Sequence, residues 1–319
     1  GRRNLGQTSP NPSVGCVLLK NNVIVGRGYT GTNGRPHAET QALKQAGSAA
    51  KGATAYLTLE PCSHEGETPP CAQALVKAGI KRAVIAVIDP DMRVNGKGMS
   101  ILEAAGIEVK VGVLSDQASL DHAGFFSSQS KYRPWITLKL AASIDGKIAT
   151  ARGDSKWITG SSARHFVHNM RRKHDAIMVG SGTVIADDPT LNVRDLGACI
   201  QPYRIVLNSN LDIPVKSNLT KKIHEQPVWI FHSNEVSEDR KSEWLEIGAK
   251  LFECHVDNFG ISIKDVMQNL SDKGITRLLC EGGGKLAASL IRSEMVDEIV
   301  TFHGGLTIGS DGFPSIGDL

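Results

Sequence analysis

The sequence reads P-H-A-E at residues 36–39 and E-P-C-S-H-E-G-E-T-P-P-C at residues 60–71, and these stretches decide the fold of the first half. They offer one imidazole and two thiolates as metal ligands, from His37, Cys62 and Cys71. A catalytic zinc site uses three protein ligands and keeps a fourth position open for water. Glu39 lies two residues after the histidine, which suits a proton-transferring carboxylate. The pattern therefore predicts a catalytic zinc centre.

The spacing of His37 and Glu39 also predicts where this centre lies. Residues two apart on an α-helix point about 200° apart around its axis, so both can face one metal only from the first turn. Pro36 and Pro69-Pro70 precede the two ligand positions, and proline favours helix starts. A helix N-terminus also lowers the pKa of a thiol. We therefore expect two helix starts, at His37 and Cys71, to face one zinc ion.

Other interpretations of this motif remain open. His64 could be a fourth ligand of a closed structural zinc site, although Glu39 would then have no role. Chance placement of buried cysteine and histidine side chains is a second alternative. The H-x-E…P-C…C pattern is instead the signature of zinc-dependent base deaminases. The chain departs from the usual C-x-x-C spacing, because eight residues separate Cys62 from Cys71.

Composition sets limits on the other function classes. The chain has 319 residues, which favours about two domains, and its 40% hydrophobic content is that of a globular protein. A net charge of +3, from 36 basic and 33 acidic residues, argues against nucleic-acid or membrane binding. The sequence has neither a transmembrane-length apolar run nor a secretory signal. The six scattered cysteines favour a reducing, cytoplasmic location. We also expect a homo-oligomer.

Strand and helix patterns alternate along both halves of the chain. In the first half we expect strands at residues 14–20, 23–29, 53–59, 82–88 and 107–113, and helices at 37–46, 72–78 and 101–105. In the second we expect strands at 135–140, 176–179, 203–207, 228–231, 250–254, 277–280 and 298–302, and helices at 162–172, 263–270 and 285–291. Between them lies the polar stretch S-S-Q-S-K-Y-R-P at residues 127–134. The sequence therefore predicts two α/β domains, at residues 1–127 and 135–319, with a linker at 128–134.

The second half has two glycine-bearing sites between a strand and a helix, at residues 175–184 and 277–287. Backbone N–H groups at such helix starts suit phosphates, but neither site matches a named phosphate motif, and either could be a plain turn. Lys139 is a lone cation in an otherwise apolar strand, so it is a candidate for chemistry or a solvent-facing residue of that strand. Asp145, beside Gly146, could equally be a turn residue.

Longer motifs carry a resemblance to a known family. In the first half these are T-S-P-N-P-S-V-G-C at residues 8–16, K-G-A-T-A-Y-L-T-L-E at 51–60 and the extended cysteine motif. In the second they are R-P-W-I-T-L-K-L-A-A-S-I-D-G-K-I-A at 133–149, S-K-W-I-T at 155–159, A-D-D-P-T-L-N-V-R at 186–194 and E-G-G-G at 281–284. Over nearly its whole length the chain resembles the bifunctional deaminase–reductases of riboflavin biosynthesis. This implies a cytidine-deaminase-like three-layer domain, followed by an α/β domain with a fold like dihydrofolate reductase.

The resemblance also implies roles for individual residues. The deaminase would use Glu39 as its catalytic acid–base group, with Asn11 and His64 on the substrate. The reductase would use Lys139 for catalysis. Its NADPH would contact Ala141, Trp157, Thr183, Asp187, Gly282, Gly283 and Gly284. Its substrate would contact Ser155, Arg171, Leu191, Arg194 and Glu281. Simpler alternatives are a turn for Asn11, a loop without substrate contact for His64, core packing for Trp157 and a solvent-facing cation for Arg171.

The implied reactions act on phosphorylated pyrimidines. The diaminopyrimidinone ribosylamine 5′-phosphate would be deaminated with Zn²⁺, and NADPH would then reduce the ribosyl group of the aminouracil to ribityl. Rival hypotheses are a nucleic-acid base deaminase, disfavoured by an aromatic content of 5%, and a zinc-stabilised binding module, disfavoured by Glu39. Because the chain starts at Gly1 and family reductases usually extend beyond its end, we expect both termini to be incomplete.

Overall fold

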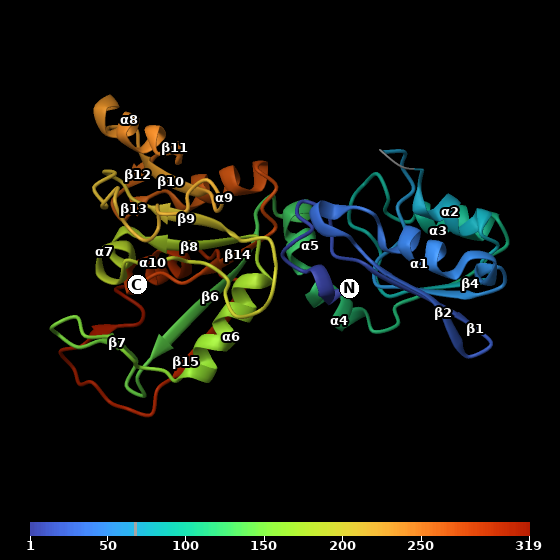
Figure 1. The fold of residues 1–319 in the computed structure, drawn as a ribbon, viewed down its shortest axis with the longest axis horizontal. Helices are drawn as coiled ribbons and strands as arrows, with labels where there is room; N and C mark the ends of the chain where they lie inside the picture. Colours follow the sequence, from blue (N-terminus) through green and yellow to red (C-terminus); the bar gives the residue numbers. More distant parts are fainter. Residues whose placement is uncertain (67–68) are drawn as a thin grey trace. The chain divides into compact units, whose positions relative to one another are not determined.

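A computed structural model describes residues 1–66 and 69–319 of the chain. The chain forms two compact units, Gly1–Tyr132 and Arg133–Leu319 (Figure 1). The division lies inside the polar stretch at residues 127–134. The first part of that stretch is helical, because α5 continues to Ser130.

Unit 1, defined as Gly1–Tyr132, is a five-stranded sheet with helices on both faces. Its strands are β1 (Gly15–Lys20), β2 (Val23–Tyr29), β3 (Thr54–Leu57), β4 (Arg82–Ile85) and β5 (Glu108–Val111). Its helices are η1 (Arg2–Asn4), η2 (Thr32–Gly34), α1 (Ala38–Ala46), η3 (Gly47–Ala50), α2 (Cys71–Lys77), α3 (Lys97–Ala104), α4 (Ser115–Asp121) and α5 (Ala123–Ser130). The strand order is β2-β1-β3-β4-β5, in which β3, β4 and β5 are parallel.

Local sequence explains the start of this sheet. Asn21 and Asn22 have φ values of 50° and 60°, a left-handed pair that closes the β1–β2 hairpin. Gly28 on β2 lets α1 approach closely, since a Cβ there would lie 1.9 Å from the Ala38 carbonyl oxygen. Alanines on α1 pack with α2 and α3 against one face of the sheet. Phe125 and Phe126 of α5 pack against a smaller cluster that contains Leu59, Val87 and Ala118 of α4. Unit 1 therefore has the three layers that the sequence predicted.

Unit 2, defined as Arg133–Leu319, is built on a seven-stranded parallel sheet. Its strands are β6 (Trp135–Ala142), β7 (Lys147–Ala149), β8 (Ala176–Gly180), β9 (Tyr203–Leu207), β10 (Val228–Ser233), β11 (Lys250–Cys254), β12 (Val256–Asp257), β13 (Gly260–Ile261), β14 (Arg277–Cys280), β15 (Glu298–His303) and β16 (Phe313–Pro314). Its helices are α6 (Ser161–Arg172), α7 (Ser181–Asp187), α8 (Glu238–Glu246), α9 (Ile263–Asp272) and α10 (Gly284–Arg292). The order in the main sheet is β11-β10-β9-β8-β14-β6-β15.

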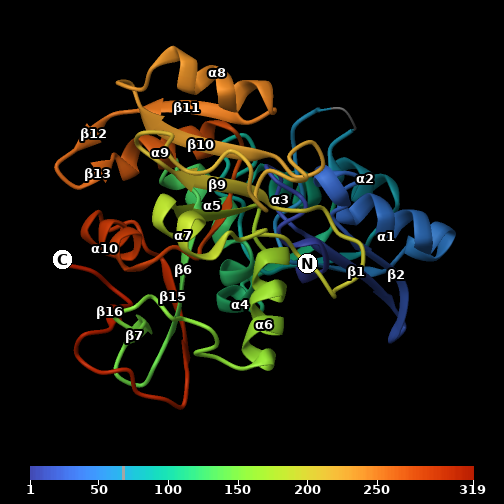
Figure 2. The same cartoon turned by 60° about the vertical axis from the view of Figure 1, so that its left-hand side comes forward.

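Successive residues of β8 show how both faces of this sheet are covered. Ala176 and Met178 belong to a core cluster with α9 and α10, whereas Ile177 and Val179 pack with α7 and α8. A parallel sheet buried on both faces carries the continuous apolar strands seen in this half of the sequence. The short β7–β16 pair lies beyond the carboxyl end of β6 (Figure 2). The two units therefore have the α/β class that was predicted.

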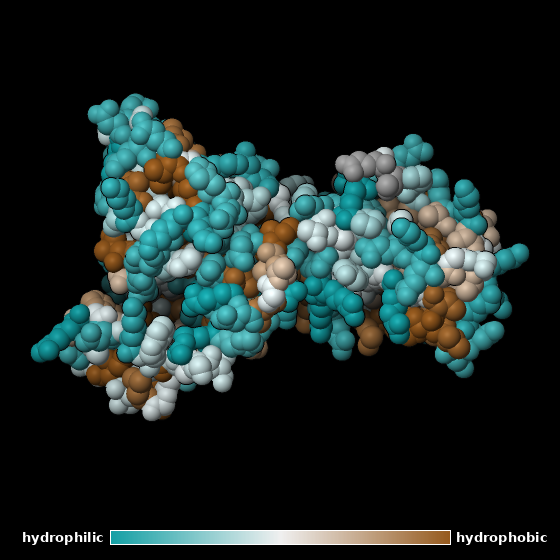
Figure 3. Space-filling model, in the orientation of Figure 1, coloured by the Kyte–Doolittle hydropathy of each residue, from teal (hydrophilic) through white to brown (hydrophobic). Residues whose placement is uncertain are grey.

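Several short elements were not predicted. Helices α4 and α8 have weak apolar periodicity, and β7, β12, β13 and β16 have only two or three residues each. No described helix has both the length and the apolar sequence that a membrane-crossing segment requires. On the face shown in Figure 3, hydrophilic residues predominate, and hydrophobic residues occur in separate patches.

Candidate active sites

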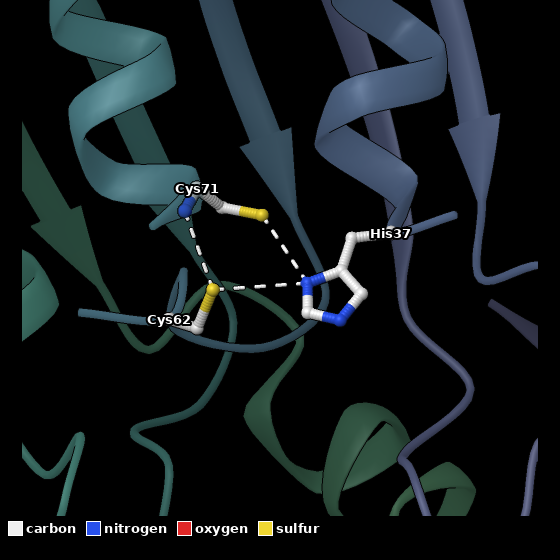
Figure 4. Close-up of side chains that lie close together, drawn as sticks. All are labelled: His37, Cys62 and Cys71. Atoms are coloured by element: carbon white, nitrogen blue, oxygen red, sulfur yellow. Dashed lines mark hydrogen bonds between the residues drawn. The ribbon is translucent and has the colours of Figure 1, made fainter. Parts of the chain in front are cut away.

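Three side chains that are distant in sequence meet in unit 1. The imidazole Nδ1 of His37 lies 3.3 Å from the Cys71 sulfur and 3.7 Å from the Cys62 sulfur (Figure 4). The backbone N–H of Cys71 donates a hydrogen bond of 3.2 Å to the Cys62 sulfur. All three potential ligand atoms lie within 4.8 Å of one another. One nitrogen and two sulfurs at this separation suit tetrahedral zinc with one position left for water.

The elements around this cluster match the expected helix starts. His37 is the N-cap of α1, and Cys71 is the first residue of α2. Cys62 lies in the loop that follows β3. The N-terminal ends of two helices therefore face the ligand atoms, and their dipoles favour thiolates there.

The pKa values of the cluster reflect this close approach. The pKa of the Cys62 thiol is well below its ordinary value, chiefly because the Cys71 side chain hydrogen-bonds to it, and His37 adds to the effect. The pKa of Cys71 is raised by its contact with Cys62 and by burial. The pKa of His37 is raised, first by its contact with Cys62. The geometry thus already favours one thiolate beside the imidazole.

Glu39 adjoins this cluster from the first turn of α1. Its side chain is buried, with 4% of its surface exposed, and its carboxylate is a hydrogen-bond partner of the Cys71 thiol. Burial raises the pKa of the Glu39 carboxyl above its usual value. A carboxyl group with a raised pKa exchanges protons more readily near neutral pH, as a general acid–base group must.

Asn11 and His64 differ in how they are held. The Asn11 amide nitrogen donates to the Gly34 carbonyl oxygen at 3.2 Å. The Nδ1 atom of His64 is buried and has no hydrogen-bond partner among the described residues. His64 lies two residues after Cys62 in the same loop.

Unit 2 contains a large cavity, with a volume of about 1010 Å³. It lies outside the carboxyl ends of the strands, where ligand sites of parallel α/β sheets generally occur. Gly180 ends β8, Leu207 ends β9 and Glu281 follows β14, and all three line it. Every unit 2 residue that was predicted to bind or act on a ligand also lines this cavity: Lys139, Ala141, Ser155, Trp157, Arg171, Thr183, Asp187, Leu191, Arg194, Glu281, Gly282, Gly283 and Gly284.

A charged cluster occupies the cavity wall. The Arg171 guanidinium donates to both oxygens of Glu281, at 2.6 and 3.0 Å, and to the Asn192 carbonyl oxygen at 3.0 Å. The Lys139 ammonium lies 4.0 Å from Glu281. Burial is the largest influence and acts to raise the pKa of Glu281, but the charge and hydrogen bonds of Arg171, together with the charges of Lys139 and His168, outweigh it, so that pKa is lowered. Arg171 is therefore not a solvent-facing helix cation, and Lys139, with 17% of its side chain exposed, is not a solvent-facing strand residue.

Helix starts at the cavity provide backbone N–H groups for phosphates. Gly180 is the N-cap of α7 and Gly283 is the N-cap of α10. A dinucleotide needs two phosphate positions and a large cavity, and two helix starts at a cavity of about 1010 Å³ fit NADPH. Trp157 is 66% exposed and its ring lies 4.3 Å from the Arg164 guanidinium, so it is not a core residue. Asp145 lies outside the cavity lining and binds backbone N–H groups of residues 308 and 309.

Sequence reasoning missed His168, which lines the cavity one helical turn before Arg171 on α6. Its Nδ1 contacts the Asn192 carbonyl oxygen at 3.2 Å. Burial, followed by the charges of Arg171 and Arg194, lowers its pKa. His168 lies three residues before Arg171, so both face the same side of the helix, and this spacing could have identified His168 from the sequence.

Comparisons with known proteins agree with this division. Residues 2–87 match the family "Cytidine and deoxycytidylate deaminase zinc-binding region", and residues 134–319 match the family "RibD C-terminal domain". The "Riboflavin biosynthesis protein RibD" of Bacillus amyloliquefaciens is 43% identical over 99% of this chain and 84% of its own length. That of Aquifex aeolicus is 42% identical over 99% of this chain and 88% of its own.

Solved structures give the same result. An Acinetobacter baumannii RibD matches with a TM-score of 0.89 and 38% identity, covering 100% of this chain and 87% of its own. A Thermotoga maritima protein, named diaminohydroxyphosphoribosylaminopyrimidine deaminase/5-amino-6-(5-phosphoribosylamino)uracil reductase, matches with a TM-score of 0.86 and 33% identity, covering 98% and 85%.

Proposed function

The chain belongs to the RibD family of riboflavin biosynthesis proteins, and we propose that each of its units carries the active site for one of the family's two reactions. It is a bifunctional deaminase and reductase, with zinc and NADPH as cofactors. We assign the deaminase to residues 1–127 with the end of α5 up to Ser130, and the reductase to 135–319, so that the linker predicted at 128–134 is shortened to residues 131–134. The division of contacts between Tyr132 and Arg133 supports this assignment.

The deaminase acts on 2,5-diamino-6-ribosylamino-4(3H)-pyrimidinone 5′-phosphate, the substrate implied by the name of the Thermotoga relative. His37, Cys62 and Cys71 hold zinc. When bound, the metal supplies Lewis acidity that makes water nucleophilic near neutral pH. Glu39 accepts one proton from the attacking water and delivers it to the ring nitrogen, and it then carries the second proton of that oxygen to the amine, which leaves as ammonia while the carbonyl forms. The buried position and raised pKa of Glu39 support this role. Asn11 and His64 orient the pyrimidine, which is supported by the unpartnered Nδ1 atom of His64.

The reductase acts on 5-amino-6-(5-phosphoribosylamino)uracil in the unit 2 cavity. NADPH supplies the hydride that converts the ribosyl group to ribityl. Cofactor phosphates bind at the Gly180 and Gly282–Gly284 helix starts, beside Ala141, Trp157, Thr183 and Asp187.

Lys139 polarises the sugar at the carbon that is reduced. Glu281 has remaining oxygen lone pairs that accept hydrogen bonds from the sugar hydroxyls. Ser155 and Leu191 contact the substrate. Arg194 clamps the substrate phosphate. Its exposed guanidinium makes one weak contact among the described residues, to the Asn192 side chain at 3.5 Å, whereas three of the five N–H groups of Arg171 already donate to Glu281 and Asn192. We therefore propose that Arg171 contributes to the substrate site by holding Glu281, and that it does not bind the substrate phosphate.

One observation carries the proposal: the candidate residues gather at two separate places, one in each unit. The test is to supply the diaminopyrimidine substrate to the zinc-loaded protein with and without NADPH. Ammonia release should not need NADPH, and NADPH oxidation should need the deaminated product. A zinc chelator should stop ammonia release while oxidation with added aminouracil continues. NADPH oxidation by undeaminated substrate at the same rate would contradict the assignment.

We further propose that the protein is a cytoplasmic homo-oligomer that does not bind nucleic acid. All six cysteines are free, which supports a reducing compartment. Light scattering on the purified protein tests the assembly, and a monomer at micromolar concentration would contradict it.

A further inference from the structure

The loop at residues 190–194 carries two of the proposed substrate ligands but has no regular secondary structure. Leu191 and Arg194 line the cavity from this loop. Leu191 has a φ of 52°, in the left-handed region that a leucine rarely adopts. Such a conformation persists only when its surroundings hold it in place. The residues that hold this loop therefore determine the positions of Leu191 and Arg194.

Gln201 holds the loop from behind. Its side-chain oxygen accepts a hydrogen bond of 2.7 Å from the Val193 N–H, and its amide nitrogen donates one of 3.0 Å to the Val193 carbonyl. One side chain thus pairs with a backbone unit as a neighbouring strand would. Gln201 itself does not line the cavity. Gln201 therefore fixes both backbone polar groups of Val193, the residue directly before Arg194.

Gln226 and Arg204 form a second anchor. The Gln226 amide donates to the Leu191 carbonyl oxygen at 2.9 Å and to that of Pro202 at 3.1 Å. The guanidinium of Arg204 is fully buried and donates to the carbonyl oxygens of Gln226 and Leu219, and more weakly to that of Thr190 at 3.4 Å. Burial alone lowers the pKa of Arg204, with no contribution from a carboxylate. A buried cation whose hydrogen bonds go to carbonyl groups is costly, so its presence at this position calls for a specific role.

We propose that Gln201 and Gln226, with Arg204 behind Gln226, are positioning residues that hold the 190–194 loop so that Arg194 meets the phosphate of the reductase substrate. This inference rests on the proposed role of Arg194. Neither glutamine touches the cavity, so both act through the loop backbone. The specificity for a phosphorylated substrate is then set partly outside the site.

The test uses Gln201→Met in the full-length, zinc-loaded protein, since methionine keeps the length of the side chain and removes both hydrogen bonds. We expect KM for the aminouracil phosphate to rise about tenfold, the loss of roughly two ordinary hydrogen bonds to the loop. KM for NADPH and kcat should change less than about twofold, because the glycine helix starts and Lys139 are untouched. Gln201→Glu keeps the acceptor for Val193 N–H and should restore part of the affinity. Gln226→Met is the second variant and should give the same split.

Gln268→Met is the matched control, because Gln268 is exposed on α9 and its amide donates to the Asp272 carboxylate of the same helix. Ammonia release in every variant reports an intact unit 1. Equal changes in kcat, NADPH KM and substrate KM would indicate general loosening and overturn the inference, as would an unchanged substrate KM.

Arg194→Met and the double variant Arg194→Met/Gln201→Met separate the inference from the proposed function. If Gln201 acts through Arg194, the double variant should show about the same KM as Arg194→Met alone. Fully additive effects would overturn the positioning role and leave the Arg194 role standing. An unchanged KM in Arg194→Met would remove the proposed phosphate clamp and the inference with it.

Discussion

Arg171 and Glu281 are 110 residues apart in sequence, and two hydrogen bonds of 2.6 and 3.0 Å join their side chains in the wall of the unit 2 cavity. The side chains are 14% and 7% exposed, so solvent screens the pair weakly. The contact ties the end of α6 to the turn after β14 and keeps Glu281 ionised beside Lys139.

Replacing Glu281 with glutamine should therefore destabilise unit 2. Arg171 and Lys139 would remain in the cavity wall without their carboxylate, and breaking a buried pair in this way costs about 3 kcal/mol. All four tryptophans of the chain lie in unit 2, so denaturant unfolding followed by tryptophan fluorescence measures this unit. Glu253→Gln, which breaks the solvent-exposed contact of 2.7 Å with Lys241, is the control and should cost less than about 1 kcal/mol. Equal effects of the two substitutions would contradict the prediction.

Glu39→Gln should separate the two activities. The substitution keeps the shape of the side chain but removes its proton transfer, which contributes roughly 10²–10⁴ in rate. Ammonia release should fall by at least the lower figure, while NADPH oxidation with added aminouracil stays near the wild-type rate. Glu103→Gln, at an exposed position of α3, is the control. Loss of both activities in a folded variant would mean that the sites are not separate.

Lys139→Met should produce the opposite pattern. The side chain keeps its length, but the ammonium beside Glu281 is lost, so NADPH oxidation should fall by about 10² or more. Ammonia release should continue normally. Lys264→Met, at an exposed position of α9, controls for the loss of one positive charge. A folded Lys139→Met variant that reduces its substrate normally would rule out a catalytic role for this residue.

Metal content provides an independent check on unit 1. The wild-type chain should contain about one zinc ion per chain by elemental analysis, because three ligand atoms converge at one point. Cys71→Ala should lose most of this zinc together with ammonia release. Cys16→Ala removes another buried thiol of the same unit and should retain the metal. Equal zinc content in the two variants would place the metal elsewhere.

Asp145 should control the loop that follows β15. Its carboxylate accepts hydrogen bonds from the N–H groups of Ile308 and Gly309 and from the Ser143 hydroxyl, and these contacts lower its pKa to about 2, first through Ser143. A lowered pKa means that the anchor is present above the ordinary value of 3.8 and is lost as pH falls through about 2. Hydrogen exchange at Ile308 and Gly309 should accelerate at neutral pH in Asp145→Asn. Asp154→Asn, in a nearby loop, should not change it.

The sequence was most informative where the candidate functional residues lie within one short motif or one strand. Two of the three proposed zinc ligands, His37 and Cys71, stand at helix starts marked by prolines, so a short motif predicted where they lie. Lys139 was found because one charge interrupts an apolar strand. Residues 128–130 were expected to open the linker, but they end α5, where the Ser128 and Ser130 hydroxyls donate to carbonyl groups of the preceding turn.

Other features depend on contacts that no local pattern records. Arg171 was assigned to the substrate, but its partner Glu281 comes from another strand end, and only the assembled sheet brings them together. Gln201 and Gln226 escaped notice because an isolated glutamine in a loop carries no periodic signal and no charge. These residues show their importance only through the backbone groups that they bind.

Each sheet takes all its strands from one unit, and the division of the chain falls between Tyr132 and Arg133. Every translated molecule therefore delivers one catalyst for each of two consecutive steps, and gene dosage cannot alter their ratio. The balance between making and consuming the deaminated intermediate then depends on the kinetic constants of the two sites and on their substrate concentrations. A substitution that slows only the second step would make the intermediate accumulate, however strongly the gene is expressed.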